Sequence, residues 1–384
     1  MRIFIALTYY RPHYSGLTIY TERLARSLAE RGHQVTVLTS RFNNNLLKRE
    51  VCNGVEVIRA DVMMRVSKGV LMPELPFLAW NRVRQADVVN LHVPQLDASY
   101  LAMMAKLFSK PVVLTYHCDL QLPTGTIHKV ANQVSHLANH LSARLADRIV
   151  TNTQDYAEHS PFLRHYLGKV HPIPPPIVLP RASTETVCAF RQKYNLTPGE
   201  KVIGIAARLA TEKGVEYLIE AMPSVLQRFP TTKVLFVGQH ENVLGEEPYA
   251  ERLQPLIQKL GGHWRFLGVV SSEELAAFYE VSDVTVLPSI NGTESFGMVQ
   301  VEAMTCGTPA VATDMPGVRQ PVRTTGMGRI VPTRDSGALA EAIIDILDHP
   351  DRYHGDAAAV TQRYSPQTIA SEYEEIFQEL TQTK

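Results

Sequence analysis

Short apolar runs alternate with longer amphipathic stretches along most of this 384-residue chain. The apolar runs are rich in Val, Ile and Leu and have the length of strands that are buried on both faces. Residues 17–28, which follow the first run, carry Leu and Tyr at helical spacing. Alternating strands and helices predict an α/β fold built on parallel sheets. The predicted strands cover residues 2–7, 34–39, 55–58, 87–91, 111–116, 148–151, 201–206, 233–237, 264–267, 283–288 and 310–313.

A proline-rich run interrupts this alternation near the middle of the chain. Residues 170–180 contain five prolines in eleven positions. Such a run predicts a stiff, extended connection that continues neither a sheet nor a helix. The chain is long enough for a separate core on each side of it. We therefore expect two doubly wound, Rossmann-like lobes, residues 1–175 and 176–364, followed by an amphipathic helix within residues 365–384.

The most informative stretch follows the predicted strand at 283–288. A polar loop leads into a helix expected from Phe296 to Thr305, and a glycine and a proline follow its end. A strand, a polar loop and a helix start form the arrangement that binds anions in open α/β sheets. We expect the free amides of Phe296, Gly297 and Met298 to point at such a ligand.

Two carboxylates flank this helix start. Glu294 precedes it and Glu302 lies on its second turn. Carboxylates that face a phosphate are unfavourable, but they can accept hydrogen bonds from hydroxyls on either side of it, such as those of a ribose and a transferred sugar. The alternative is that Glu302 is a solvated helix residue and Glu294 a loop charge. The residues alone leave both interpretations open.

Candidate cations and histidines follow other predicted strands. Arg208 and Lys213 come after the strand at 201–206 and before a helix, where two cations could clamp a diphosphate. The alternative is an ordinary pair of surface cations. His92 and His117 each end a predicted strand, and ligands bind at the carboxyl ends of parallel strands. A lone histidine can equally be a satisfied structural residue.

The charge balance differs between the two halves of the chain. Residues 1–180 contain 20 Lys and Arg against 12 Asp and Glu, whereas the remainder contains 18 against 26. A basic N-terminal half favours an anionic partner, such as a membrane surface or a phosphorylated acceptor. The alternative is attraction between the two lobes. Residues 62–77 mix apolar side chains with Arg65 and Lys68, so they either touch lipid or pack on the core.

Membrane-spanning segments, signal peptides and cysteine usage indicate where in the cell a protein is located. We find no apolar run of membrane-spanning length and no signal peptide in the sequence. Four cysteines lie scattered without metal-ligand spacing, which argues against zinc and against a disulfide framework. We expect a cytoplasmic protein, with the inner face of the cell membrane as a candidate location and no nucleic-acid partner.

Residues 294–313 resemble the E-x7-E signature of retaining glycosyltransferases of family 4, and the resemblance extends over nearly the whole chain. It implies the GT-B fold, in which two Rossmann-like lobes face a cleft. Residues 1–175 would bind the acceptor and residues 176–364 the nucleotide sugar. The helix at 365–384 would cross back to the N-terminal lobe.

The resemblance also assigns roles to residues. Arg208 and Lys213 would hold the donor pyrophosphate, and His117 would lie near the transferred sugar. Glu294 would bind sugar hydroxyls and Glu302 the ribose. The family often has a Gly-Gly pair in the first loop, which here reads Ser-Gly. The remaining donor-binding candidates are Gly16, Val270, Ser295, Phe296, Gly297, Met298 and Val299.

The expected reaction is transfer of a sugar, with retention of anomeric configuration, from a nucleotide-diphosphate sugar to a hydroxyl of a lipid or a glycan. We favour a UDP-sugar, with GDP-mannose as second choice. We expect no cofactor and no metal, because the chain has no D-x-D triplet. The alternatives are a GT-B epimerase or sugar phosphorylase, and a nucleotide-sugar binding protein without catalysis.

Overall fold

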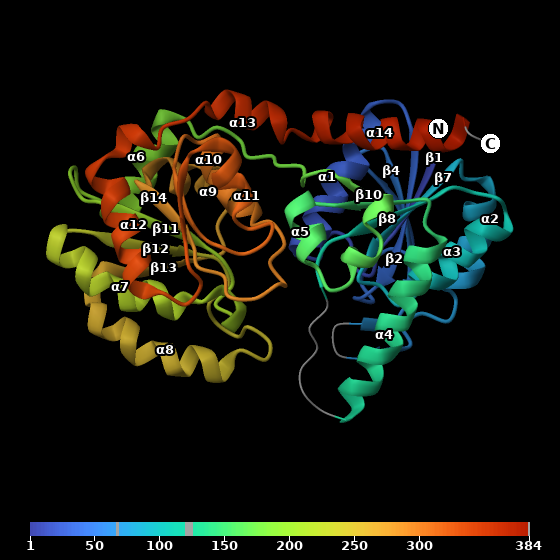
Figure 1. Ribbon diagram of the computed structural model, residues 1–384, viewed down its shortest axis with the longest axis horizontal. Coiled ribbons are helices and arrows are strands. Elements are labelled where there is room, and N and C mark those ends of the chain that lie inside the picture. Colours follow the sequence, from blue (N-terminus) through green and yellow to red (C-terminus); the bar gives the residue numbers. More distant parts are fainter. Residues whose placement is uncertain (67–68, 120–125, 383–384) are drawn as a thin grey trace. The chain divides into compact units, whose positions relative to one another are not determined.

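The protein divides into two compact units in the computed structural model, which describes residues 1–66, 69–119 and 126–382. Unit 1 comprises Met1–Pro176 together with Tyr364–Lys384, and unit 2 comprises Ile177–Arg363. Each unit has its own mainly parallel sheet with helices packed on it (Figure 1). The C-terminal segment therefore belongs to the same compact unit as the N-terminus.

Unit 1 is built on an eight-stranded sheet in the order β10-β9-β8-β7-β1-β2-β4-β3. All pairs are parallel except the antiparallel pair β3–β4 at one edge. The sheet strands are β1 (Arg2–Ala6), β2 (Gln34–Arg41), β3 (Arg49–Cys52), β4 (Val55–Asp61), β7 (Val88–Val93), β8 (Val112–Tyr116), β9 (Arg148–Thr151) and β10 (Val170–Pro172). A separate hairpin joins β5 (Met64–Val66) and β6 (Gly69–Leu71).

The helices of unit 1 cover this sheet. They are α1 (Gly16–Glu30), α2 (Leu75–Gln85), α3 (Ala98–Leu107), α4 (Thr126–Leu145), α5 (Gln154–His159) and α14 (Pro366–Gln382). Helix α14 packs along α1 (Figure 1), and its apolar stripe joins the core formed by α1 and the sheet. The hydroxyls of Tyr20 and Tyr373 are 2.8 Å apart, and Arg31 forms an ion pair with Glu374 at 2.5 Å. A terminal helix thus becomes an integral part of unit 1.

Unit 2 contains a six-stranded sheet in the order β13-β12-β11-β14-β15-β16, with every pair parallel. The strands are β11 (Val202–Ala206), β12 (Lys233–Val237), β13 (Trp264–Gly268), β14 (Val284–Leu287), β15 (Ala310–Thr313) and β16 (Gly328–Val331). The helices are α6 (Thr184–Lys193), α7 (Val215–Arg228), α8 (Glu247–Leu260), α9 (Ser272–Val281), α10 (Met298–Thr305), α11 (Gln320–Thr325), α12 (Ser336–Asp348) and α13 (Ala357–Arg363).

Several predicted boundaries are wrong. Helix α10 begins at Met298 rather than Phe296, because Gly297 adopts a left-handed conformation with φ 77°. Strand β7 runs on to Val93, so His92 lies inside the strand rather than after it. The proline-rich run begins with the short strand β10, which pairs at the edge of the sheet where proline is tolerated.

The described residues between 62 and 77 are only partly packed on the core, and contact of the others with lipid stays a prediction. Val70, Met72 and Leu75 are buried in the core, whereas the side chains of Met63 and Phe77 are exposed. Lys68, which the sequence analysis placed in the same stretch, lies outside the described residues. No helix of the described chain is long and apolar enough to cross a membrane.

Candidate functional site

The loops after β11 and β14 lie against each other at the carboxyl edge of the unit 2 sheet. The amide of Ile290 donates to the carbonyl of Glu212 at 3.0 Å. Gly214 has φ +61°, and a Cβ atom there would lie 2.2 Å from the carbonyl oxygen of Pro288. Only a residue without a side chain allows the two backbones to approach so closely. This contact brings Lys213 to the loop that carries Glu294.

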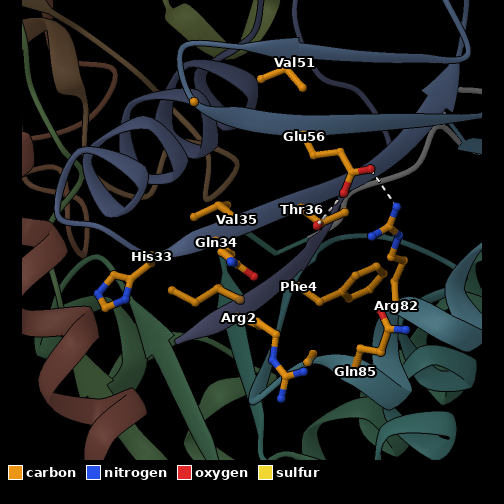
Figure 2. A pocket seen from close by; sticks show the side chains of 13 residues that line it. Arg2, Phe4, His33, Gln34, Val35, Thr36, Val51, Glu56, Arg82 and Gln85 are labelled. Atoms are coloured by element: carbon orange, nitrogen blue, oxygen red, sulfur yellow. Dashed lines mark hydrogen bonds and ion pairs between the residues drawn. The ribbon is translucent and has the colours of Figure 1, made fainter.

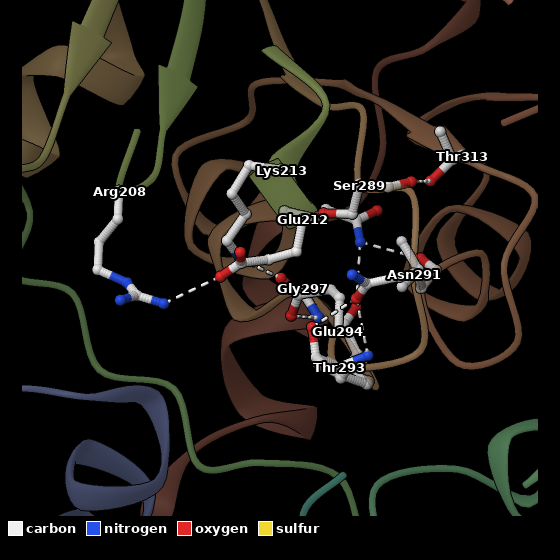
Figure 3. Close-up of polar contacts among 12 residues, drawn as sticks. Arg208, Glu212, Lys213, Ser289, Asn291, Thr293, Glu294, Gly297 and Thr313 are labelled. Atoms are coloured by element: carbon white, nitrogen blue, oxygen red, sulfur yellow. Dashed lines mark hydrogen bonds and ion pairs between the residues drawn. The ribbon is translucent and has the colours of Figure 1, made fainter. Parts of the chain in front are cut away.

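Lys213, Glu294 and Gly297 form one polar cluster (Figure 3). The Nζ atom of Lys213 lies 2.5 Å from Oε2 of Glu294, and both side chains are largely buried. The other carboxylate oxygen, Oε1, accepts the amide hydrogen of Gly297 at 3.1 Å. Each oxygen of Glu294 therefore has a different partner, which fixes the carboxylate just before α10.

A second turn stabilises the same loop. The Oδ1 atom of Asn291 accepts from the backbone amide of Thr293 at 3.1 Å and from its hydroxyl at 2.6 Å. An asparagine that accepts from the backbone two residues later makes an Asx turn. Figure 3 shows Asn291 and Thr293 beside the glutamate. The turn presets the backbone from which Glu294 projects.

The predicted amides at the start of α10 are not all free. The amide of Gly297 already donates to Glu294, which corrects the expectation that it points at a ligand. Ser295 and Phe296 are buried, and Met298 and Val299 are partly buried in the first turn. The first amides of any helix have no carbonyl partner within the helix, so the first turn of α10 still offers donors.

Glu302 is not a solvated helix residue. Its side chain is buried in unit 2, and the hydroxyl of Tyr279 on α9 donates to its Oε2 at 3.3 Å. A buried carboxylate requires hydrogen-bond donors, because water does not solvate it there. The alternative in which Glu302 is a solvated helix residue is therefore wrong, and its role toward a ligand stays a prediction.

Arg208 and Val270 lie apart from the cluster. The guanidinium of Arg208 is half exposed and pairs with Glu212 at 3.0 Å, within the same loop as Lys213 (Figure 3). Val270 follows β13, which is separated from β11 by β12. Arg208 thus has a local partner instead of standing as an open cation.

In unit 1, His117 directly follows β8 as predicted, and Gly16 is the first residue of α1. His117 is buried, and its burial lowers the pKa of the imidazole to about 3. Ser15, which stands in place of the first glycine of the family pair, caps α1 because its hydroxyl accepts from the amide of Thr18 at 3.2 Å. His117 and Gly16 both lie at the carboxyl edge of the unit 1 sheet.

A separate pocket of about 340 Å³ lies at the opposite edge of the unit 1 sheet (Figure 2). Arg2 and Gln34, which begin β1 and β2, line it. Its Glu56 accepts from Arg82 at 2.7 Å, so these charges are already paired. Ligands of parallel α/β sheets bind at the carboxyl ends of strands, and this pocket is therefore not part of the candidate site.

Within the described part of the chain, no three His, Cys, Asp or Glu side chains are grouped so as to hold a metal ion. The polar groups that the structure brings together before α10 are the ammonium of Lys213, the carboxylate of Glu294 and the amide of Gly297.

Two family models match complementary parts of the sequence. The model described as "Glycosyltransferase Family 4" matches residues 14–181, and the model described as "Glycosyl transferases group 1" matches residues 188–361. A D-inositol 3-phosphate glycosyltransferase of Geodermatophilus obscurus is 30% identical over 363 residues, which cover 86% of this chain and 77% of the relative. This chain belongs to glycosyltransferase family 4.

Other relatives agree with this assignment. A phosphatidyl-myo-inositol mannosyltransferase of Mycobacterium leprae is 28% identical to this family 4 protein over 375 residues, with 94% of this chain and 92% of the relative covered. The crystal structure of Anabaena HepE in complex with UDP-glucose matches with a TM-score of 0.77 at 22% identity, over 99% of this chain and 100% of the other. The protein therefore has the GT-B fold and is a glycosyltransferase.

Sequence reasoning missed several polar partners in this family 4 protein. Glu212 pairs with Arg208, and Tyr279 donates to Glu302 from a different helix. Glu212 lies directly before Lys213, so an acidic residue between the two cations was a visible signal. Tyr279 carries no such signal, because only the packing of α9 against α10 brings it to Glu302.

Proposed function

We propose that this glycosyltransferase moves a sugar from a nucleotide-diphosphate sugar to a hydroxyl acceptor with retention of anomeric configuration. The observation that carries the proposal is the Lys213–Glu294–Gly297 cluster before α10. A lysine ammonium has three donors, so Lys213 can bind Glu294 and a phosphate oxygen together. Cleavage of the sugar–phosphate bond leaves charge on the diphosphate, and Lys213 stabilises that charge.

The other site residues take the roles expected from the sequence. Arg208 exchanges its exposed pairing with Glu212 for the diphosphate, since an arginine fork matches phosphate geometry. Glu294 accepts from hydroxyls of the transferred sugar, and Glu302 from the ribose. We propose that His117 contacts the transferred sugar. We propose that this chemistry uses no metal, because the sequence has no D-x-D triplet and the cations are supplied by the chain.

For the donor we propose a UDP-sugar first and GDP-mannose second. HepE was crystallised with UDP-glucose, and the mycobacterial relatives are named as mannosyltransferases. For the acceptor we propose a hydroxyl of a lipid or a glycan, with an inositol phosphate or its lipid as the leading candidate. The names of the two curated relatives both contain inositol, and the basic N-terminal half suits a phosphorylated acceptor.

Thermal-shift measurements with UDP, GDP, ADP and their sugars test the donor. A ligand at about 100 times its Kd adds about 2.7 kcal/mol to the unfolding free energy. The preferred sugar is then incubated with inositol phosphates, and proton NMR reads the anomeric configuration of the product. An inverted product overturns retention. Donor hydrolysis at equal rates with and without acceptor overturns transfer.

The alternative activities give different products in the same assay. Sugar phosphate that forms only when inorganic phosphate is added indicates a phosphorylase. An epimerised donor in the absence of acceptor indicates an epimerase. Tight donor binding without any product across the acceptor panel indicates a binding protein without catalysis.

We also propose that unit 1 meets an anionic membrane surface. Phe77 is 81% exposed and Trp80 46% exposed on α2, with Leu107 on α3 exposed at 68%. Exposed aromatic residues beside a cation such as Arg84 are typical of membrane-surface helices. Vesicles containing anionic phosphatidylglycerol should sediment the protein, and Phe77→Ser with Trp80→Ser should reduce this binding. Leu244→Ser, at an exposed position of unit 2, is the control.

A further inference from the structure

The helix that follows Lys213 begins without a side-chain cap. Lys213 ends a single turn of 3-10 helix, Thr211–Lys213, and Gly214 is the N-cap residue of α7. A polar side chain at an N-cap normally accepts an amide hydrogen of the first helical turn. Gly214 is required here, because a Cβ atom would lie 2.2 Å from the carbonyl oxygen of Pro288. The close approach of the two loops therefore leaves the first amides of α7 in need of an acceptor from elsewhere.

Tyr249 on α8 supplies such an acceptor. Its hydroxyl oxygen accepts the amide hydrogen of Val215 at 3.0 Å, and its hydrogen is donated to Oε2 of Glu216. A neutral phenol can donate one hydrogen bond and accept another, so the two bonds exist together. Burial and the bond to Glu216 raise the pKa of Tyr249, which keeps its hydroxyl in this neutral form. Tyr249 thus takes the place of the missing cap.

The carboxylate of Glu216 is buried and has a second partner. Arg252, which lies three residues after Tyr249 on α8, donates to its Oε1 atom at 3.1 Å. Each carboxylate oxygen therefore has a donor. A buried carboxylate costs free energy even when it is paired, and apolar residues in its place are often at least as stable. We therefore look for the role of this group in the geometry that it imposes on the start of α7.

A second side chain at the start of α8 holds the other end of the 3-10 turn. The Oε2 atom of Glu246 accepts from the amide of Thr211 at 2.8 Å and from its hydroxyl at 2.7 Å. Thr211 is the first residue of the turn, and Val215 lies two residues after its end at Lys213. The backbone that carries Lys213 is therefore fixed on both sides by side chains of one helix start.

We infer that Tyr249 and Glu246 are positioning residues, which hold the turn Thr211–Lys213 so that the ammonium of Lys213 lies against Glu294 (Figure 3). The role of Lys213 toward a diphosphate rests on the proposed function, whereas its positioning does not. A displacement of about 1 Å in a site can lower a rate about 100-fold, even when the changed residue lies far from the chemistry. Neither Tyr249 nor Glu246 needs to touch a substrate to have such an effect.

The first test needs no substrate. Acetic anhydride in limiting amount acetylates lysines, and peptide mass spectrometry gives the rate at Lys213 relative to Lys193, whose side chain is more exposed. Tyr249→Phe should raise this relative rate about threefold or more, because the turn opens more often. Tyr353→Phe is the matched control, since the Tyr353 hydroxyl also donates to a carboxylate, that of Asp345, in the same unit. An unchanged rate in Tyr249→Phe overturns the inference.

The second test asks whether Tyr249 acts through Lys213. Tyr249→Phe should lower kcat/KM about 10- to 100-fold when Lys213 is present. In a Lys213→Ala background it should lower kcat/KM less than about twofold, because the group to be positioned is gone. A purely structural effect of Tyr249 would lower the activity by the same factor in both backgrounds. Equal factors therefore overturn the inference.

Glu246→Ala provides the same tests at a partly exposed position, where folding is preserved even if Tyr249→Phe does not fold. It should raise the relative acetylation of Lys213 and should lower kcat/KM only when Lys213 is present. Glu247→Ala is the matched control, because Glu247 is the next residue of the chain and is exposed. If the two variants behave alike, the inference is wrong.

The two proposals fail differently. If the wild-type protein transfers no sugar from any donor, or if Lys213→Ala changes neither kcat/KM nor the Kd of UDP, the proposed function of Lys213 fails. The acetylation rates then decide the positioning by themselves. If neither Tyr249→Phe nor Glu246→Ala changes the acetylation of Lys213, the inference is wrong whatever the activity.

Discussion

The ammonium of Lys213 and the carboxylate of Glu294 form an ion pair across 81 residues of sequence, with Nζ and Oε2 2.5 Å apart. The pair joins the loop after β11 to the loop before α10, so it fixes the geometry of both. Under the proposed function, the donor diphosphate would meet a cation whose charge is already partly balanced. Variants of the two residues, alone and together, can therefore measure how much Lys213 contributes to catalysis.

Lys213→Ala should reduce kcat/KM by about 10²- to 10³-fold, because one donor to a developing charge is removed. The loss should be smaller when it is measured in a Glu294→Gln background, since the two groups interact. Steady-state kinetics of the two single variants and the double variant give this coupling. Lys193→Ala is the control, because Lys193 forms a more exposed ion pair with Glu274 in the same unit. Full additivity would contradict the proposed coupling.

Variants of Glu302 and Glu294 should have different effects, the first on nucleotide binding and the second on recognition of the donor sugar. Glu302→Ala removes the buried carboxylate that we propose accepts from the ribose, and it should raise the Kd of UDP about 10- to 100-fold. Glu294→Gln keeps an oxygen for the amide of Gly297 and should leave the UDP Kd nearly unchanged while reducing discrimination among donor sugars. Calorimetric titration with UDP and kinetics with several sugars measure both. Equal weakening of UDP binding in both variants would contradict this division.

The fold was predictable because its signals are local. Alternating apolar strands and amphipathic helices appear directly in the sequence, and the stretch from Asp283 to Pro309 predicts a strand, a loop and a helix. The exact start of α10 was not predictable from helical spacing. Gly297 takes a left-handed conformation because the loop must turn there, and this shortens the helix by two residues.

The partners of the site residues were not predictable, because they depend on packing between distant segments. Glu302 looked equally like a solvated helix residue until Tyr279 and its burial were seen. His92 looked like a residue at the end of a strand, whereas it is an interior residue bonded to His117. Periodicity specifies which face of an element is buried, but it does not specify which polar atoms meet there.

Gly297→Ala should destabilise unit 2 more than Gly326→Ala does. Both glycines have positive φ, 77° and 71°, and alanine is strained at either position. A Cβ at position 297 would additionally lie 2.3 Å from Leu287, which is buried and cannot move away freely, whereas position 326 has open space. We expect a difference of about 1 kcal/mol or more in unfolding free energy, measured by calorimetry. Equal effects would show that the close approach to Leu287 is unimportant.

Acid should destabilise unit 1 through its two buried histidines. The pKa of His117 is lowered to about 3, and that of His92 is also lowered, whereas an unfolded histidine has a pKa of about 6.5. Between these values the unfolded chain binds more protons than the folded one. The unfolding free energy therefore falls as the pH is lowered through this window, by at most about 1.4 kcal/mol per pH unit for each group.

His92→Phe removes one of these groups, so the unfolding free energy of this variant should depend less steeply on pH between pH 7 and pH 5. The other partly buried histidines of unit 1 are present in both proteins, and their contributions cancel in the comparison. Urea unfolding, followed at several pH values by the circular dichroism of each protein, measures the two slopes. Identical slopes would mean that His92 binds protons equally in the folded and unfolded chains, and would contradict the lowered pKa that its burial implies.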